Sequence, residues 1–177
     1  MKLQDIDTPA LVVDLDAMER NIAAIAATLR ERNVAWRPHA KCHKSPAIAR
    51  KLIDEAGAIG VTCQKLGEAE VMADAGIDHI LVANEVVGEA KIRRLVALRQ
   101  RGVDVTIAVD DAGVLERTAA AACEAGVTVP VVVEVNIGQD RCGVEPGEPA
   151  VALARRAATA QGIEFRGLMG WEGHVMH

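Results

Sequence analysis

The sequence alternates short β-branched runs with longer amphipathic runs, and this alternation constrains the fold more than any other feature. Strands that are apolar on both faces belong to a parallel sheet that is covered by helices. The alternation therefore predicts an α/β fold built from βα units. Seven runs are typical of strands, and most are apolar throughout: 10–14, 34–41, 58–62, 79–83, 103–109, 129–135 and 164–170.

The runs between these strands carry the spacing and end signals of helices. Apolar residues recur every three to four positions within 18–29 and 48–53, so each run has one face to bury. Ser45 and Pro46 supply an N-cap followed by a proline at the first helical position, and Asp16 with Glu19 resembles a capping box. Five glycines follow helical runs at positions where a positive φ closes a helix: Gly57, Gly76, Gly102, Gly126 and Gly162.

Doubly wound α/β folds share this alternation, but they commonly carry a phosphate-binding or dinucleotide-binding loop after an early strand. The sequence contains neither GxGxxG nor GxxxxGK[ST]. We therefore expect a (β/α)8 barrel of the TIM type. If 34–41 is the first barrel strand, 164–170 is the sixth, so about six of the eight βα units are expected in this chain.

Composition excludes several classes of protein. The net charge of −5 comes from 25 acidic and 20 basic residues that are scattered along the chain, which argues against nucleic-acid binding. No stretch approaches the roughly 18 continuous apolar residues of a membrane span, and no signal peptide is visible. The four cysteines form no CxxC pair, so we expect neither a zinc knuckle nor a disulfide framework, and a cytoplasmic location fits best.

A barrel gathers its active site at the carboxyl ends of its strands. Arg37, His39 and Lys41 alternate along the first predicted strand and should share one face. A primary amine beside other cations is favoured in its uncharged form, which is the form that attacks an aldehyde, so Lys41 is a candidate Schiff-base lysine. Spacing alone equally allows Lys41 to begin a solvated loop. Lys44 directly precedes a helix start and is expected to face solvent.

Five segments carry a resemblance to a known family: DTPALVVDLDAMERNI, RPHAKCHKSP, TCQKLGEAEVMADAGIDHILVANEVVG, VEVNIGQDRCGVEPG and GLMGWEGH. They resemble the D-threonine aldolase and D-serine dehydratase-like family, whose barrel is similar to the N-terminal domain of alanine racemase. The resemblance covers essentially the whole chain. It implies that Lys41 carries pyridoxal 5′-phosphate, that Arg141 lies by the phenolic oxygen of the cofactor, and that Trp171 stacks on its ring where tyrosine is commoner.

Three further residues are candidates for this site. His174 is a candidate catalytic acid or base, and His39 and Thr62 are candidate cofactor-binding groups. A simpler interpretation is that His174 hydrogen-bonds at a strand end and that Thr62 caps the next helix. For Arg141 the simpler interpretation is a surface ion pair. The sequence has no tyrosine, and racemases of this class use a tyrosine as their second proton shuttle, which disfavours a racemase.

The resemblance implies a lyase that cleaves D-3-hydroxy amino acids to glycine and an aldehyde. A D-serine dehydratase-like ammonia-lyase, a non-catalytic pyridoxal-phosphate carrier and an inactive barrel remnant are alternatives. Relatives use a divalent metal held by a C-terminal β domain, so we name no metal ligand here. We expect residues 1–15 to supply a strand that joins that domain in relatives, and residues 16–177 to form a partial barrel. We expect this chain alone to bind the cofactor weakly; a homodimer is left open.

Overall fold

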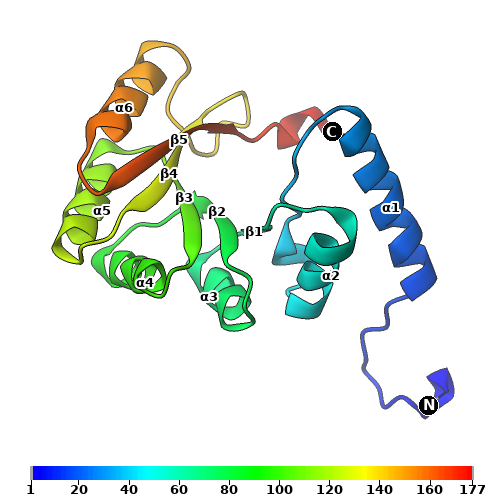
Figure 1. Ribbon diagram of the computed structural model, residues 1–177. Coiled ribbons are helices and arrows are strands. Elements are labelled where there is room, and N and C mark those ends of the chain that lie inside the picture. The colour runs from blue at the N-terminus through cyan, green and yellow to red at the C-terminus, as the bar shows by residue number, and fades with distance from the viewer. Residues whose placement is uncertain (1, 177) are drawn as a thin grey trace.

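A computed structural model describes residues 2–176, which contain a curved parallel sheet with helices along its outer side (Figure 1). The sheet order β1-β2-β3-β4-β5 is the order along the chain, and every neighbouring pair is parallel. This order is that of an open part of a (β/α) barrel. The strands are β1 (Val61–Cys63), β2 (His79–Glu85), β3 (Asp104–Val109), β4 (Val129–Val135) and β5 (Ile163–Gly170).

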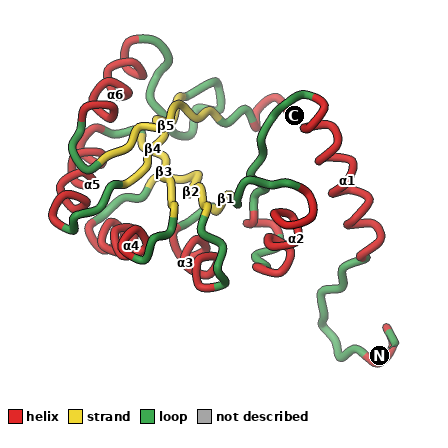
Figure 2. Tube along the Cα trace, in the orientation of Figure 1, coloured by secondary structure: helices red, strands yellow, loops and turns green. Residues whose placement is uncertain are grey.

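Helices connect these strands and lie together on one side of the sheet, as Figure 2 shows. Buried aliphatic side chains such as Ile80, Ile107 and Leu95 fill the layer between helices and strands. The helices are α3 (Leu66–Asp74), α4 (Glu89–Gln100), α5 (Ala112–Glu124) and α6 (Glu148–Thr159). No helix among the described residues is long and apolar enough to cross a membrane.

The first predicted barrel strand, 34–41, is wrong in its extent. Its assigned pairing is a single bridge between His39 and Thr62, and a 3₁₀ turn, η2 (Ala40–Cys42), follows directly. The amides of Ile59 and Thr62 nevertheless donate to the carbonyls of Trp36 and Pro38 at 3.0 and 2.9 Å, so the segment occupies a strand position beside β1. Pro38 has no N–H to donate to a neighbouring strand. The side chain of His39 accepts the amide of Lys41 and caps the 3₁₀ turn that follows.

Residues 10–14 form no strand within the described part of the chain, and their pairing with a C-terminal β domain, as in relatives, stays a prediction. The Leu11 side chain is fully exposed, and the segment runs away from the sheet to α1 (Leu15–Glu31) (Figure 2). The predicted capping box of Asp16 and Glu19 is wrong. Asp14 is the N-cap, and its carboxylate accepts the amide of Ala17 at 2.9 Å.

Other predicted boundaries are confirmed. Ser45 caps α2 (Pro46–Ala56) through a hydrogen bond from the amide of Ile48, and Pro46 occupies the first turn. Gly57 ends this helix with a φ of +72°. The other four predicted helix-closing glycines also have positive φ values. Ends that depend on one local residue were therefore readable from the sequence.

Candidate active site

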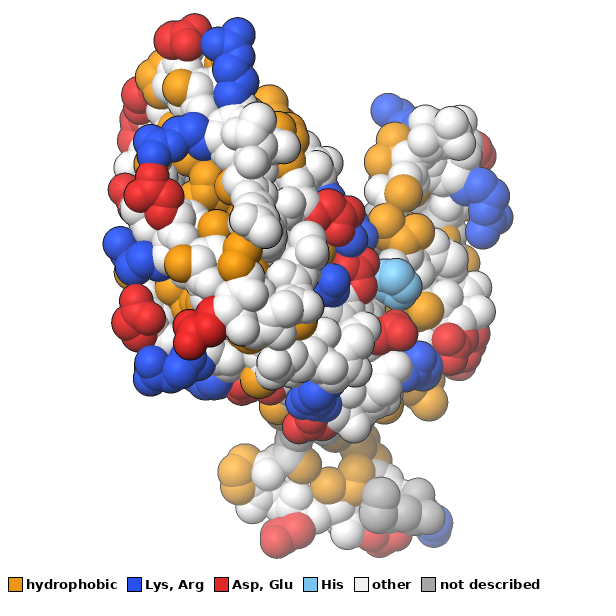
Figure 3. Space-filling model, turned by 60° about the vertical axis from the view of Figure 1, so that its left-hand side comes forward, with side chains coloured by type: hydrophobic (Ala, Val, Ile, Leu, Met, Phe, Trp, Pro, Cys, Tyr) orange, Lys and Arg blue, Asp and Glu red, His pale blue; other side chains and the backbone are white. Residues whose placement is uncertain are grey.

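A hollow of about 480 Å³ lies at the carboxyl ends of the strands. Figure 3 shows the molecule hollowed between the sheet with its outer helices and the part that contains α1 and α2, with charged and histidine side chains on the walls. Six of the sequence-derived candidates meet in its lining: Arg37, His39, Lys41, Thr62, Arg141 and Trp171. Gln64, Leu81, Ala83, Asn84, Glu134, Met169 and Gly170 complete the lining.

Lys41 lies in the turn η2, at the place where the strand-like segment leaves the sheet. Its Nζ is 5.7 Å from the centroid of the Trp171 ring, within the range of a cation–π interaction. Lys44 takes a different position, because its side chain is 62% exposed and its Nζ lies 3.4 Å from a carboxylate oxygen of Glu68. The geometry therefore favours Lys41 over Lys44 as the amine that faces the hollow.

His39 and Thr62 fix the backbone that carries Lys41. Nδ1 of His39 accepts the amide of Lys41 at 3.3 Å, so the neutral ring carries its proton on Nε2. Burial, and then the charge of Lys41, lower the pKa of His39, which favours that neutral form at pH 7. The Thr62 hydroxyl donates to the carbonyl of Arg37 at 3.0 Å and ties the segment to β1.

Arg141 projects from a loop, residues 136–144, that is tied down at several points. The amide of Val144 donates to the carbonyl of Glu134 at 2.9 Å, and the amide of Gly143 donates to Oδ2 of Asp110 at 3.0 Å. A Cβ at Gly143 would lie 2.6 Å from the backbone nitrogen of Asn136, so this close turn requires glycine. Asp110 and Asn136, which follow β3 and β4, thus support this loop and do not line the hollow.

His174 lies outside the lining of the hollow. It belongs to the short turn η3 (Gly173–Met176), and a Cβ added to Gly138 would lie 2.8 Å from its Nε2. The imidazole therefore packs against the Arg141 loop, and its role as an acid or base stays a prediction.

Sequence reasoning missed a group of polar side chains beside Arg141, of which Glu134 is buried and the other two are half-buried. Carboxylate oxygens of Glu85 and Glu134 and the sulfur of Cys142 lie within 4.8 Å of one another. Burial, followed by the contact with Glu85, raises the pKa of Glu134 to about 7. The available signal was Glu134 itself, a lone acid in the otherwise apolar strand VPVVVEV, since an acid there requires a buried partner.

Two members of this group are joined by a hydrogen bond. The thiol of Cys142 donates to Oε1 of Glu134 at 3.2 Å. Glu134 and Arg141 both line the hollow.

The described residues fit a pyridoxal phosphate of the kind that the resemblance implies. The hollow falls within the volume range of small-molecule sites. A primary amine and an aromatic ring face each other on its walls. Nε of Arg37, also in the lining, is buried without a hydrogen-bond partner in the described part of the chain. An amine, an aromatic face and an unused donor suit an aromatic aldehyde that carries anionic groups.

Comparison with known proteins identifies the class of protein. The family model of the alanine racemase N-terminal domain matches residues 13–175, and the chain belongs to this family. The predicted α/β partial barrel is thereby confirmed.

Particular relatives narrow the comparison further. The chain is 42% identical to the D-threonine aldolase of Arthrobacter sp. over 99% of its own length and 46% of the relative. It is 39% identical to the 3-hydroxy-D-aspartate aldolase of Paracoccus denitrificans (strain Pd 1222), over 100% and 46% of the two chains. The crystal structure of the D-threonine aldolase of Filomicrobium marinum superposes with a TM-score of 0.95 at 49% identity, covering 99% of this chain and 47% of that one. The chain thus spans about half the length of the relatives it matches.

Proposed function

We propose that this chain is the cofactor-binding part of a pyridoxal-phosphate-dependent lyase that cleaves D-3-hydroxy amino acids to glycine and an aldehyde. The observation that carries the proposal is the amine of Lys41, which faces the hollow 5.7 Å from the Trp171 ring. The names of two similar relatives support the substrate class, because threonine and 3-hydroxyaspartate are both 3-hydroxy amino acids.

Each residue has a definite task in this proposal. Lys41 holds the cofactor through its Nζ, and Trp171 covers one face of the aromatic ring. Arg141 donates hydrogen bonds to the phenolic oxygen and orients the substrate. His39 holds the turn that presents Lys41. Bound pyridoxal phosphate supplies an electron sink for the bond cleavage at Cα of the substrate.

The proposal also covers a metal, the substrate, the assembly and a cytoplasmic location. A divalent metal assists the reaction, held by ligands outside this chain. The substrate is a D-amino acid, and a homodimer is one assembly to test. The four cysteines are free, as a reducing cytoplasm requires.

The decisive experiment is trapping of the cofactor on the intact protein. Pyridoxal phosphate is added, the sample is reduced with borohydride, and the labelled peptide is mapped. We expect the label on Lys41, its loss in Lys41→Ala and its retention in Lys44→Ala. Label on another residue would refute the assignment.

A product assay separates the reaction types. The aldolase releases glycine and an aldehyde from D-threonine, whereas a dehydratase releases a keto acid and ammonia. A protein that takes the label on Lys41 and releases neither set of products would be a carrier.

A further inference from the structure

The cluster of Glu85, Glu134 and Cys142 lies beside the proposed site, but the proposed reaction does not use it. Glu134 comes from β4 and is only 2% exposed. Glu85 ends β2 at an irregularity where the pairing with β3 moves from Val82–Ile107 to Glu85–Ala108. Such irregularities redirect side chains. Two acidic groups from the strands on either side of β3 are thus brought together.

The cluster lacks hydrogen-bond donors. The Cys142 thiol donates to Oε1 of Glu134. Oε2 of Glu134 and Oε1 of Glu85 are buried and have no partner within residues 2–176. Two ionised carboxylates this close together and out of water are strongly unfavourable. A proton on one of them supplies the missing donor and removes one of the two charges.

We propose that Glu85 and Glu134 share one proton, so that the pair keeps a single negative charge on the wall of the hollow that Arg141 also lines. In this arrangement the O–H of one carboxyl group donates to an oxygen of the other carboxylate. The shared proton stands independently of the cofactor and of the proposed function.

The surrounding charges agree with one negative charge on the pair. Burial raises the pKa of Cys142 to about 11, so its thiol stays protonated and adds no charge at neutral pH. Arg37, Lys41 and Arg141 are the cations in the lining of the hollow that Glu134 also lines, and His39 there is favoured in its neutral form. Of these cations, Arg141 comes from the loop that also carries Cys142, whose thiol donates to Glu134.

Infrared spectroscopy of the intact, cofactor-free protein tests the shared proton. At a pH just below neutral, the wild type should show the carbonyl band of a protonated carboxyl group. Glu134→Gln should abolish that band, and Glu85→Gln should move its loss to lower pH, because the contact with Glu85 adds to burial in raising the pKa of Glu134. Glu124→Gln, at an exposed position of α5, is the control and should keep the band unchanged. A band that survives in Glu134→Gln, or that Glu85→Gln leaves unchanged, would overturn the proposal.

Two controls complete the design. Zinc titration of the cofactor-free protein should give no binding that depends on Cys142, and binding abolished by Cys142→Ser would overturn the proposal in favour of a metal site. A thermal melt shows whether each single variant is folded; if one is not, the presence or absence of the wild-type band still decides. Failure of label on Lys41 would refute the proposed function and leave the infrared result unchanged.

Discussion

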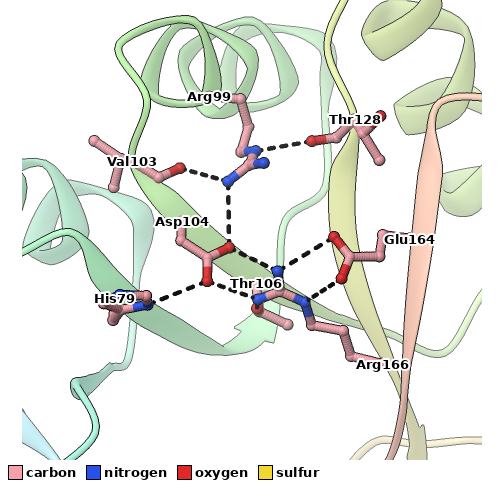
Figure 4. Close-up of polar contacts among 8 residues, drawn as sticks. All are labelled: His79, Arg99, Val103, Asp104, Thr106, Thr128, Glu164 and Arg166. Carbon is pink, nitrogen blue, oxygen red and sulfur yellow. Dashed lines mark hydrogen bonds and ion pairs between the residues drawn. The ribbon is translucent and has the colours of Figure 1, made fainter.

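The two ends of the sheet differ in whether their polar groups have hydrogen-bond partners. At the amino end, Asp104 accepts hydrogen bonds from Arg166 at 2.9 Å and from Arg99 at 3.3 Å, and His79 lies 3.2 Å away (Figure 4). Arg166 also donates to the hydroxyl of Thr106. Nearly every donor in this network has an acceptor. The amino end of a barrel serves stability, and matched pairs are what stability requires.

The carboxyl end leaves polar atoms unmatched. Nε of Arg37, Oε1 of Glu85, Oε2 of Glu134 and Oε1 of Gln139 are buried there without partners among the described residues. Unsatisfied buried atoms lower stability, so they persist where a ligand, a proton or further chain completes them. This difference between the two ends distinguishes the groups that hold the strands together from those that are free to bind a ligand or a proton.

A bulge in β5 makes the amino-end network possible. Phe165 pairs with Val131 and Gly167 pairs with Val132, so Arg166 is the extra residue between them. From this position Arg166 reaches past β4 to Asp104 on β3 (Figure 4). It also binds Glu164 of its own strand through Nε and Nη2. Arg166 therefore links strands that are not neighbours in the sheet.

The largest effect that we expect on stability comes from Asp104→Ala. Removing Asp104 leaves Arg166 and Arg99 partly buried without their shared acceptor, and we expect a loss of about 3 kcal/mol in the free energy of unfolding. Urea denaturation measures it. Asp74→Ala, which breaks the exposed pair with Arg101, should cost no more than about 1 kcal/mol. Labelling of Lys41 should be unchanged in Asp104→Ala; a loss of labelling in the folded variant would break the contrast between the two ends.

Much of this fold could be predicted, because its signals are local. Continuous apolar runs gave four of the five strands nearly whole, and Ser45, Pro46 and Gly57 marked helix ends by their own chemistry. The extent of 34–41 and the strand at 10–14 could not be predicted in the same way. A strand needs a partner, and partners are a property of tertiary structure.

The candidate site shows the same difference between features with a local signal in the sequence and features that depend on tertiary contacts. The period of two along 34–41 correctly placed Arg37, His39 and Lys41 on one face toward the hollow. The places of Glu85 and Arg166 depend on a local irregularity and a bulge, which no periodicity reveals. His174 follows a strand end in the sequence, but its place against Gly138 depends on the turn after that strand, so periodicity could not give it.

Arg141→Gln should show the opposite pattern to that expected for Asp104→Ala, with a large effect on cofactor loading and a small effect on stability. Cofactor loading should weaken roughly tenfold, because a charge-assisted hydrogen bond to the cofactor is lost. Arg141 is exposed, so the free energy of unfolding should change by no more than about 0.5 kcal/mol. Arg156→Gln removes the surface pair with Glu116 and serves as the matched control, with normal loading. Normal loading by Arg141→Gln would mean that this end of the sheet binds the cofactor without it.

The smallest expected effects are slopes of stability with pH, and the first concerns the amino end. Burial would raise the pKa of Asp104, but the hydrogen bond and charge of Arg166, with His79 and Arg99, outweigh it and lower that pKa. Stability from this carboxylate is complete above its unfolded pKa of about 3.9 and is lost as the pH falls through the lower folded value. Asp104→Asn should therefore differ from wild type most at pH 5 and above, and the difference should shrink in acid. A difference that is constant with pH would show that the charge is not what stabilises this end.

The carboxyl end should respond with the opposite sign. The pKa of Glu134 rises to about 7 in the folded protein, from about 4.3 in an unfolded chain. Between these values the folded state holds a proton that the unfolded state has released, so stability falls as the pH rises, by at most about 1.4 kcal/mol per pH unit. Glu134→Gln should remove this decline while leaving the acid-side loss due to Asp104 in place. Urea titrations of both variants from pH 3 to pH 8 would then distinguish the two ends by the sign of the slope of the free energy of unfolding with pH. The amino end depends on a carboxylate that is stabilised in its charged form, whereas the carboxyl end depends on a carboxyl group that is stabilised in its protonated form.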